Sequence, residues 1–435
     1  MIFDHSFHAL GLHMHQPPGN LKLLLETNAW EAEQIVRCYE RAVRYALRYR
    51  DVAHLHVGFS GVLLEQFLDP GIVDGYRRIL DIPQMLELYR QADNIELIGM
   101  GHYHPIFPLI PKADWAEQLS LGRIIMEEVF GRAPRGFWPP EMAFSMEMIP
   151  ALVKAGYEYV VVDGVHVRPE DGLSDIYRPY RACLDGVCIT VVPRDRVISN
   201  AQESGLDPAW FFNESRSRTQ ASPRPGDPRL VTTWSDGENG GWFRQLHEAS
   251  GFFGHFFAPY MEQVRRAEAG SIPVSLSSYL RDHPATARAQ VQTGAWNVGS
   301  TSGVDFSQWA GSETQKDAVR VLHDLSQRYW GLQPQQGELG ADGVEALDRA
   351  RSLILEAETS CFLFWGDSWI PHLFERAELA TRALDRASQG LQGGAGQPVA
   401  RTSSDAGPFD GGNGGAGREA APPLQRHFEA SSDEG

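Results

Sequence analysis

The chain carries the run Gly136-Phe137-Trp138-Pro139-Pro140-Glu141-Met142-Ala143-Phe144-Ser145, which ends a short apolar strand and opens a loop. Two prolines fix the backbone just before Glu141 and donate no ladder hydrogen bonds, so the strand stops there. Phe137, Trp138 and Phe144 surround the carboxylate with aromatic surface, which suits an acid or nucleophile beside a sugar-like ring. A carboxylate that only forms an ion pair in a rigid loop is the alternative, and a second acidic partner would decide between them.

Short apolar strands alternate with helical patterns around this run. We expect strands at 7–13, 52–58, 95–100, 136–137, 157–162, 187–192, 230–234 and 272–275, and helices at 30–49, 62–68, 83–92, 114–130 and 146–155. This alternation implies an α/β fold with a parallel sheet, and the number of turns is close to what a barrel needs. In such a barrel the strand exits share one face, where residues far apart in sequence converge.

The sequence changes character beyond 293–297. Three apolar stripes at helical spacing follow, within 318–329, 344–354 and 373–384. We therefore expect a catalytic barrel at 1–300 and a helical domain packed on it at 301–388. From Gln389 onward Gly, Ser, Pro, Ala and Asp dominate, so 389–435 is predicted to be a disordered tail.

The composition of the chain argues against several classes of binding partner. The formal charge of -17 disfavours nucleic acid and an anionic membrane surface, and a neutral substrate fits better. No apolar run of ~20 residues could cross a bilayer, and the first residues lack the pattern of a secretory leader, so a cytoplasmic location is the expectation. The four cysteines lack metal-site spacing; Cys183 and Cys188 could pair, but buried thiols are favoured. The oligomeric state stays open.

The second carboxylate is Asp236, in the run Thr232-Thr233-Trp234-Ser235-Asp236-Gly237-Glu238-Asn239-Gly240-Gly241-Trp242. It follows a predicted strand and stands among glycines that let a ligand approach the backbone. The alternative is a turn aspartate before glycine. Together, Glu141 and Asp236 make the paired-carboxylate site that glycoside cleavage needs.

Histidines give a second signal and a rival interpretation. Three His-x-His pairs lie on or just past predicted strands, at His13/His15, His54/His56 and His102/His104. A metal-dependent hydrolase or deacetylase could use such pairs to activate water. Neutral imidazoles that bind sugar hydroxyls explain the pairs at strand ends without a metal, and His54 fits an ordinary core position.

Five stretches, in their order along the chain, resemble glycoside hydrolase family 57. They are His13-Met14-His15-Gln16-Pro17, Gly101-His102-Tyr103-His104-Pro105, and the runs 136–141, 234–239 and 358–367. They are spread over residues 1 to about 385, which makes the match specific. The resemblance implies an incomplete parallel (β/α)7 barrel followed by a helical C-terminal part, and activity on α-glucans.

The resemblance also implies roles for individual residues. Glu141 would be the nucleophile and Asp236 the acid/base of a retaining, double-displacement mechanism, which needs carboxyl groups ~5 to 5.5 Å apart. Glu238, two residues further on, is the competing acid/base candidate. We expect substrate contacts from His13, His15, His104, Trp138, Trp234 and Trp365, and orienting contacts from Asp163, Arg194 and Asp367. No cofactor and no metal are expected.

The family includes several activities on one scaffold. The run 358–367 and the stretch 293–316 favour an α-amylase-like hydrolase of α-1,4-linked glucans. A 4-α-glucanotransferase or a glucan branching enzyme is the alternative. A glucan-binding relative without catalysis would have lost a carboxylate, and both carboxylates are present.

Overall fold

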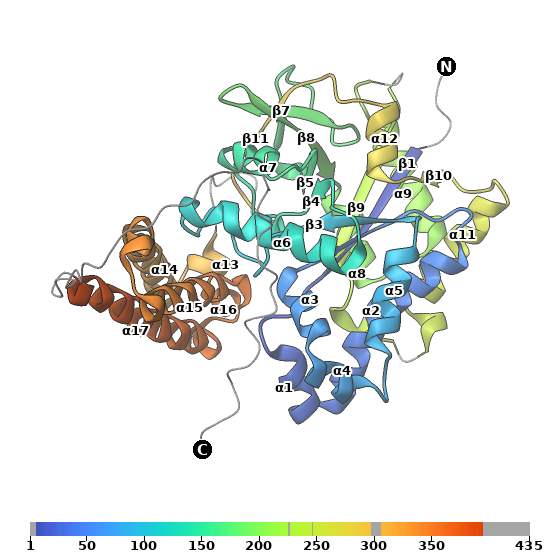
Figure 1. The fold of residues 1–435 in the computed structure, drawn as a ribbon. Coiled ribbons are helices and arrows are strands. Elements are labelled where there is room, and N and C mark those ends of the chain that lie inside the picture. The colour runs from blue at the N-terminus through green and yellow to red at the C-terminus, as the bar shows by residue number, and fades with distance from the viewer. Residues whose placement is uncertain (1–5, 225–226, 246, 297–305, 395–435) are drawn as a thin grey trace, which may run out of the picture. The chain divides into compact units, whose positions relative to one another are not determined.

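The computed structural model describes residues 6–224, 227–245, 247–296 and 306–394, and a sheet of nine strands lies at its centre (Figure 1). The strands are β1 (Ser6–Met14), β2 (Leu55–Phe59), β3 (Ile95–Gly99), β4 (Gly136–Phe137), β5 (Tyr159–Asp163), β7 (Tyr180–Leu184), β8 (Val187–Arg194), β9 (Leu230–Asp236) and β10 (Ser271–Pro273). A separate antiparallel pair joins β6 (Val167–Pro169) to β11 (Ala289–Val291).

Seven of the strands follow one another in parallel, in the order β9, β1, β2, β3, β4, β5 and β8. β10 pairs with the first residues of β1, and β7 adds an antiparallel edge to β8. Between β8 and β9 the described residues form no ladder. Instead, Asp195 N donates to Thr232 O and Arg194 Nε donates to Trp234 O, each at 2.8 Å. The fold is therefore an incomplete parallel α/β barrel of seven strands, as the resemblance implies.

A glycine sets the contact between β1 and β9. A Cβ on Gly11 would come within 2.0 Å of the Trp234 ring, so only glycine lets the two strands pair at this point. Their register places His13 opposite Asp236. The close approach thus brings the exit of the first strand to the predicted acid/base residue.

Helices connect the strands close to the predicted positions, and Figure 1 shows α2, α5 and α6 outside the sheet. The helices of this part are α1 (Asn20–Thr27), α2 (Ala29–Arg48), α3 (Gly61–Leu68), α4 (Pro70–Tyr76), α5 (Ile82–Gln91), α6 (Trp115–Phe130), α7 (Ile149–Lys154), α8 (Arg196–Ser204), α9 (Pro208–Gln220), α10 (Gly240–Phe243), α11 (Ala258–Arg265) and α12 (Leu276–Asp282). Several start at side-chain caps, as where Ser60 accepts from Leu63 N and Asp81 accepts from Gln84 N. None of the described helices combines the length and apolar character needed to span a bilayer.

The helical C-terminal part contains α13 (Ser307–Ala310), α14 (Glu313–Leu332), α15 (Ala341–Ala357), α16 (Ser360–Phe364) and α17 (Ile370–Gly394). α14, α15 and α17 share an apolar core of their own, yet Leu322, Phe362 and Leu373 belong to the same core as barrel residues. Met1–Gly394 accordingly forms one compact unit. The boundary predicted near 300 lies outside the described residues. α17 runs to Gly394, past Gln389, where the predicted tail begins, and the rest of that tail lies outside the described residues.

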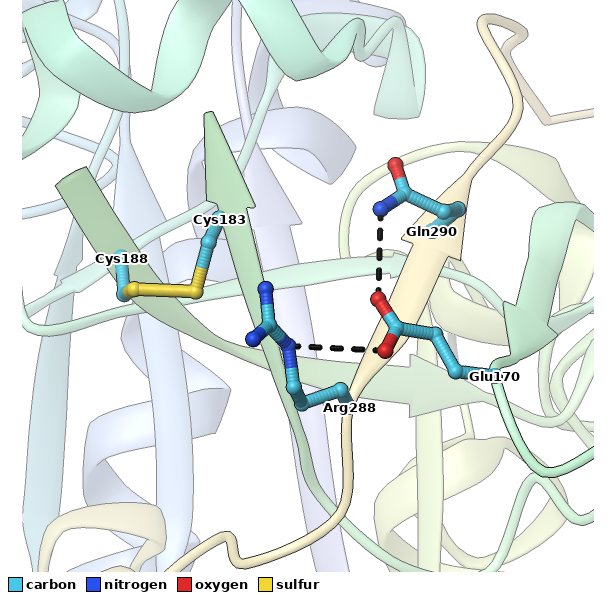
Figure 2. Close-up of a disulfide and its surroundings, with 5 residues drawn as sticks. All are labelled: Glu170, Cys183, Cys188, Arg288 and Gln290. Atoms are coloured by element: carbon cyan, nitrogen blue, oxygen red, sulfur yellow. Dashed lines mark hydrogen bonds and ion pairs between the residues drawn. A yellow bond between two sulfur atoms is a disulfide. The ribbon is translucent and has the colours of Figure 1, made fainter. Parts of the chain in front are cut away.

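Cys183 and Cys188 form a disulfide, so the prediction of buried thiols is wrong for this pair (Figure 2). The two-residue turn Asp185-Gly186, with φ of 50° and 81°, connects β7 to β8. Both residues of a type I′ hairpin turn have positive φ, and Asp-Gly is a favoured sequence there. This turn sets Cys183 directly opposite Cys188 with their Cα atoms 4.1 Å apart, close enough for a cross-strand bond.

Candidate active site

Glu141 follows β4 in a short 3-10 turn, Pro140–Met142. Its φ of 56° and that of 53° at Met142 lie in the left-handed region, which costs non-glycine residues roughly 1–2 kcal/mol each. The amide of Trp138 donates to Gly99 O at 2.8 Å, so the start of the loop is still held against β3. The Glu141 side chain is 17% exposed and can therefore be reached from solvent.

Trp296 holds Glu141 through two hydrogen bonds. Its indole Nε1 donates to Glu141 Oε2 at 2.7 Å, and its backbone amide donates to Glu141 O at 3.0 Å. Beside this contact, Phe144 and Gly294 exchange backbone hydrogen bonds of 2.9 and 3.2 Å. The guanidinium of Arg194 lies 5.6 Å from the centre of the Trp296 ring. The predicted nucleophile is thus fixed by a loop 155 residues further along the chain.

Asp236 is the last residue of β9 and is half-buried. Asn239 Nδ2 donates to Asp236 Oδ2 at 2.7 Å, which orients the carboxylate within its own loop. The partner of Asp236 in the ladder is His13 of β1. The side chain therefore lies at the strand exits, as the sequence predicts.

Glu141 and Asp236 lie close enough for their charges to interact. Burial and then the charge of Asp236 raise the pKa of Glu141 to about 8, against the lowering effect of the hydrogen bond from Trp296. Burial also raises the pKa of Asp236, opposed by the hydrogen bond from Asn239 and by the charge of Arg194. At neutral pH the pair therefore carries about one proton, and the raised pKa of Glu141 places it on Glu141 itself, whereas a retaining mechanism uses it on the acid/base.

Two further carboxylates neighbour Asp236. Glu238 is only 1% exposed, its Oε1 accepts the backbone N–H of His15 at 2.9 Å, and burial raises its pKa well above the usual range. A buried carboxyl that is committed to the backbone is a poor proton donor to substrate, so the geometry favours Asp236 over Glu238 as acid/base. Glu203 of α8 is half-buried, and burial followed by the charge of Asp236 raises its pKa.

His13, His15 and His104 form one stacked cluster at the exits of β1 and β3. The Nε2 atoms of His13 and His104 share a hydrogen bond at 2.9 Å, and the ring centres of His15 and His104 lie 3.8 Å apart. His104 Nδ1 lies 3.9 Å from Glu141 Oε1. Burial lowers the pKa of His13 to about 3 and, together with the neighbouring rings, lowers those of His15 and His104 well below the usual range. The three imidazoles are neutral at pH 7 and suited to hydrogen-bond hydroxyl groups.

The helical part supplies contacts to this histidine cluster. Ser360 Oγ makes a hydrogen bond with His104 Nδ1 at 2.7 Å, and Ser360 N donates to His104 O at 3.0 Å. Cys361 Sγ lies within hydrogen-bonding distance of His15 Nε2, at 3.3 Å, and Ser60 Oγ contacts His15 Nδ1 at 2.8 Å. Both the barrel and the helical part therefore orient the imidazoles.

Trp138 and Trp234 stack on each other with ring centres 4.9 Å apart, and both are fully buried. Trp138 also packs on Trp296, at 5.7 Å. These rings form an inner layer of the site, and their direct contact with substrate stays a prediction. The predicted orienting residues Asp163 and Arg194 form a buried ion pair at 3.3 Å. Arg194 connects that pair to the site through its contacts with Trp234 O and the Trp296 ring.

In the described part of the chain, no hydrogen bond, ion pair or ring contact links Trp365 or Asp367 to the other predicted residues. Trp365 is 56% exposed at the end of α16, and Asp367 is exposed in the short turn Gly366–Ser368. Among the described residues, neither makes a side-chain hydrogen bond or ion pair with Glu141 or Asp236. Their roles in binding and orientation stay predictions.

The remaining histidines do not build a metal centre. His56 is fully buried, with Nδ1 2.9 Å from Leu10 O and Nε2 accepting from Leu276 N, and His102 Nε2 lies 2.9 Å from Glu65 Oε1. Within the described ranges, no group of three or more His, Cys, Asp or Glu side chains has a geometry that could hold a metal ion.

Sequence reasoning missed Trp296, Glu203, Ser360 and Cys361 as parts of the site. Trp296 stands in the run Gly294-Ala295-Trp296-Asn297, just after a short strand. An aromatic residue in that position could have indicated a site residue, but we interpreted this run only as the end of the barrel. Ser360 and Cys361 lie inside the fifth motif. Only the tertiary fold brings Glu203, on a helix, toward Asp236.

The family model for glycosyl hydrolase family 57 matches residues 9–292. The chain belongs to glycosyl hydrolase family 57. An α-amylase from Pyrococcus horikoshii is 28% identical over 243 residues, 55% of this chain and 34% of the relative. A 4-α-glucanotransferase from Thermococcus litoralis is 30% identical over 190 residues, 42% of this chain and 26% of the relative. The family 57 chain thus spans about a third or less of the length of these two curated relatives.

A solved structure extends the likeness beyond the matched residues. A family 57 branching enzyme from Thermococcus kodakaraensis aligns with a TM-score of 0.66 at 15% identity, over 89% of this chain and 90% of that chain. At this identity the likeness shows the fold alone. The alignment covers a larger share of the chain than the residues 9–292 that the family model matches.

Proposed function

We propose that this family 57 chain cleaves α-1,4-linked glucans by a retaining double displacement, with Glu141 as nucleophile and Asp236 as acid/base. The observation that carries the proposal is a pair of carboxyl groups at the strand exits whose charges interact, one of them held by the Trp296 indole. Family membership supports the reaction class, and an α-amylase among the relatives supports the substrate class.

In the first step, the Glu141 carboxylate attacks the anomeric carbon while Asp236 gives its proton to the departing glycosidic oxygen. A covalent glycosyl ester on Glu141 results. Asp236, now ionised, takes a proton from water, whose oxygen attacks the same carbon and releases Glu141. The hydrogen bond from Trp296 stabilises the ionised form of Glu141 that the first and last stages share.

The surroundings of the pair suit a neutral sugar chain. Neutral imidazoles of the histidine cluster can both donate to and accept from hydroxyl groups. An open surface hollow of about 460 Å³ lies beside the loop after Asp236, but neither the carboxylate pair nor the histidine cluster lines it. This hollow is lined by Trp30, Gly240, Gly241, Arg244, Gln245 and His247.

The test is the substitution Glu141→Gln, assayed on soluble starch and maltooligosaccharides by chain-length analysis of the products. Glutamine keeps an acceptor for the Trp296 indole but is no nucleophile, so we expect activity to fall by roughly 10³-fold or more with an unchanged melting temperature. Glu147→Gln is the matched control, because Glu147 lies a few residues after Glu141 in the sequence and its exposed side chain pairs only with Lys112 in the described part of the chain. Full activity of Glu141→Gln would remove the assignment.

A 4-α-glucanotransferase or branching enzyme is the second candidate, favoured by the relatives with those names. The same product analysis separates the reactions. Hydrolysis raises the number of reducing ends, transfer redistributes chain lengths at a constant number of reducing ends, and branching creates α-1,6 linkages. The carboxylate pair is required in each case.

A further inference from the structure

Glu358 is a buried carboxylate at the start of the segment that brings Ser360 and Cys361 to the histidine cluster. It is 0% exposed, as is Asp114, which lies more than 200 residues earlier in the chain. Gln118 Nε2 donates to Glu358 Oε2 at 2.8 Å. The proposed reaction gives Glu358 no chemical role, so its burial calls for an explanation.

Asp114 faces Glu358 across the junction between barrel and helices. One oxygen of Asp114 accepts from Arg351 Nη1 at 2.7 Å and from Trp330 Nε1 at 2.8 Å. The other oxygen, Oδ2, and Oε1 of Glu358 are both buried and accept no hydrogen bond from a protein donor among the described residues. A hydrogen bond between the two carboxyl groups satisfies both oxygens if Glu358 carries a proton.

The electrostatics agree with that arrangement. Burial, the charge of Asp114 and the hydrogen bond to Asp114 raise the pKa of Glu358 well above its usual range, while Gln118 and Arg351 oppose the shift. Arg351 also pairs with the partly exposed Glu117, at 2.6 Å. Arg351 thus pairs with Asp114 and Glu117, and its charge also acts on Glu358. A proton on Glu358 relieves the excess negative charge of these three carboxyl groups.

The junction leads directly to the site. Gln118 also accepts the amide of Tyr103 through its Oε1, next to His104. Thr359 forms a β-bridge with Pro105, and Ser360 then makes the two hydrogen bonds to His104 described above. A displacement of Glu358 would therefore move both sides of the contact that orients the His104 ring.

We propose that Glu358 is a positioning residue, whose protonated carboxyl group bonds to Asp114 and fixes the segment Thr359–Cys361 against His104 and His15. Its effect on kinetics rests on the proposed function, whereas its effects on stability and on the His104 ring do not. The segment then acts as a support for the imidazoles that neighbour Glu141. The experiment compares Glu358→Gln, which imitates the protonated form, with Glu358→Leu.

The first readout is the melting temperature as a function of pH. Because the folded-state pKa of Glu358 is raised, wild-type stability should fall as pH rises from the ordinary carboxyl value of ~4.3 toward the raised value. Glu358→Gln has no such proton, so its melting temperature should gain on wild type by about 2 °C per pH unit in that window. A difference that does not change with pH would overturn the proposal.

The second readout is the His104 ring. We expect the ¹⁵N resonances of this ring to match wild type in Glu358→Gln and to shift in Glu358→Leu. The value of kcat/KM on a glucan should fall less than about threefold in Glu358→Gln and more than about tenfold in Glu358→Leu. Glu356→Gln is the control, because Glu356 lies two residues earlier and forms a half-buried pair with Arg376 at 2.7 Å. Unchanged His104 resonances in Glu358→Leu would also overturn the proposal. If wild type acts on no glucan, the proposed function fails, and the stability and resonance data alone decide the role of Glu358.

Discussion

At the residue scale, the ionisation of Glu141 depends on two opposed effects. Burial and the charge of Asp236 favour its protonated form, whereas the Trp296 indole favours the carboxylate. A hydrogen bond to a charged group contributes about 1.5–3 kcal/mol, which corresponds to roughly one to two pH units. One neighbouring ring therefore decides how much of the nucleophile is ionised at neutral pH.

We predict that Trp296→Phe moves the basic limb of kcat/KM to higher pH by about one unit, because phenylalanine keeps the ring but donates no hydrogen bond, so the pKa of Glu141 rises. The measurement is the pH profile on a maltooligosaccharide. Trp309→Phe serves as the control, since Trp309 is fully buried and its Nε1 has no hydrogen-bond partner among the described residues. A basic limb that stays in place would show that the indole does not set the ionisation of Glu141.

The shared proton gives a second prediction. Below the pKa of about 8 that Glu141 takes beside charged Asp236, the pair holds one proton, and above it both carboxyl groups are ionised. The acid is then lost, so kcat/KM should fall tenfold per pH unit well above about pH 8. At low pH a second proton neutralises the nucleophile and activity falls again. Activity that stays level to pH 10 would contradict a catalytic proton on this pair.

Single residues also show how far the sequence could lead. Glu141 and Asp236 stand out because each follows an apolar strand and is surrounded by aromatic residues or glycines. The roles of Trp296 and Ser360 depend on loops that return to the site from distant parts of the chain. Neither periodicity nor spacing encodes such a return, so these contacts become visible only in the folded structure.

At the scale of elements, the pairing of β1 with β9 depends on Gly11. We predict that Gly11→Ala lowers stability by about 3 kcal/mol or more, because the new methyl group meets the Trp234 ring. Activity should fall as well, since Asp236 ends the displaced strand. Thermal unfolding and the starch assay measure both effects.

The control for Gly11→Ala is Gly331→Ala in α14. A Cβ at Gly331 meets no atom within 4 Å, so alanine there should stabilise the helix by roughly 0.5–1 kcal/mol. If Gly11→Ala behaved like Gly331→Ala, the close approach of β1 and β9 would not be required for folding.

Strands and helices could be predicted because their apolar periodicity is strong. The disulfide could not, since a spacing of five residues has meaning only once the Asp185-Gly186 turn is recognised as a hairpin turn. That turn has the composition of a type I′ turn, so the information was in the sequence. What was missing was the antiparallel edge strand β7 in a sheet that otherwise reads as parallel.

At the scale of the whole molecule, barrel and helical part share one core. Barrel residues such as Ile106 and Phe107 belong to the same cluster as Leu322 and Phe362. We predict that a chain ending at residue 305 is insoluble or lacks a cooperative unfolding transition, because this apolar surface loses its cover. Soluble yield and calorimetry test this.

A chain ending at Gly394, which keeps every described residue, is the control and should unfold like the full chain. A shortened chain of 305 residues that melts cooperatively within about 5 °C of the full chain would make the barrel an independent domain. The fold class could be predicted as a whole because alternating strands and helices leave few arrangements. The shared core could not, because the apolar stripes of the helices do not identify their partners.

The missing ladder between β8 and β9 gives the strands that lead to the two catalytic candidates different neighbours. β4 is clamped between β3 and β5, whereas β9 has a ladder only with β1 among the described strands. In the proposed mechanism, β4 leads to Glu141, which attacks a single carbon. β9, with a ladder on one side only, carries Asp236, which would serve two partners in turn, first the departing sugar and then the incoming acceptor.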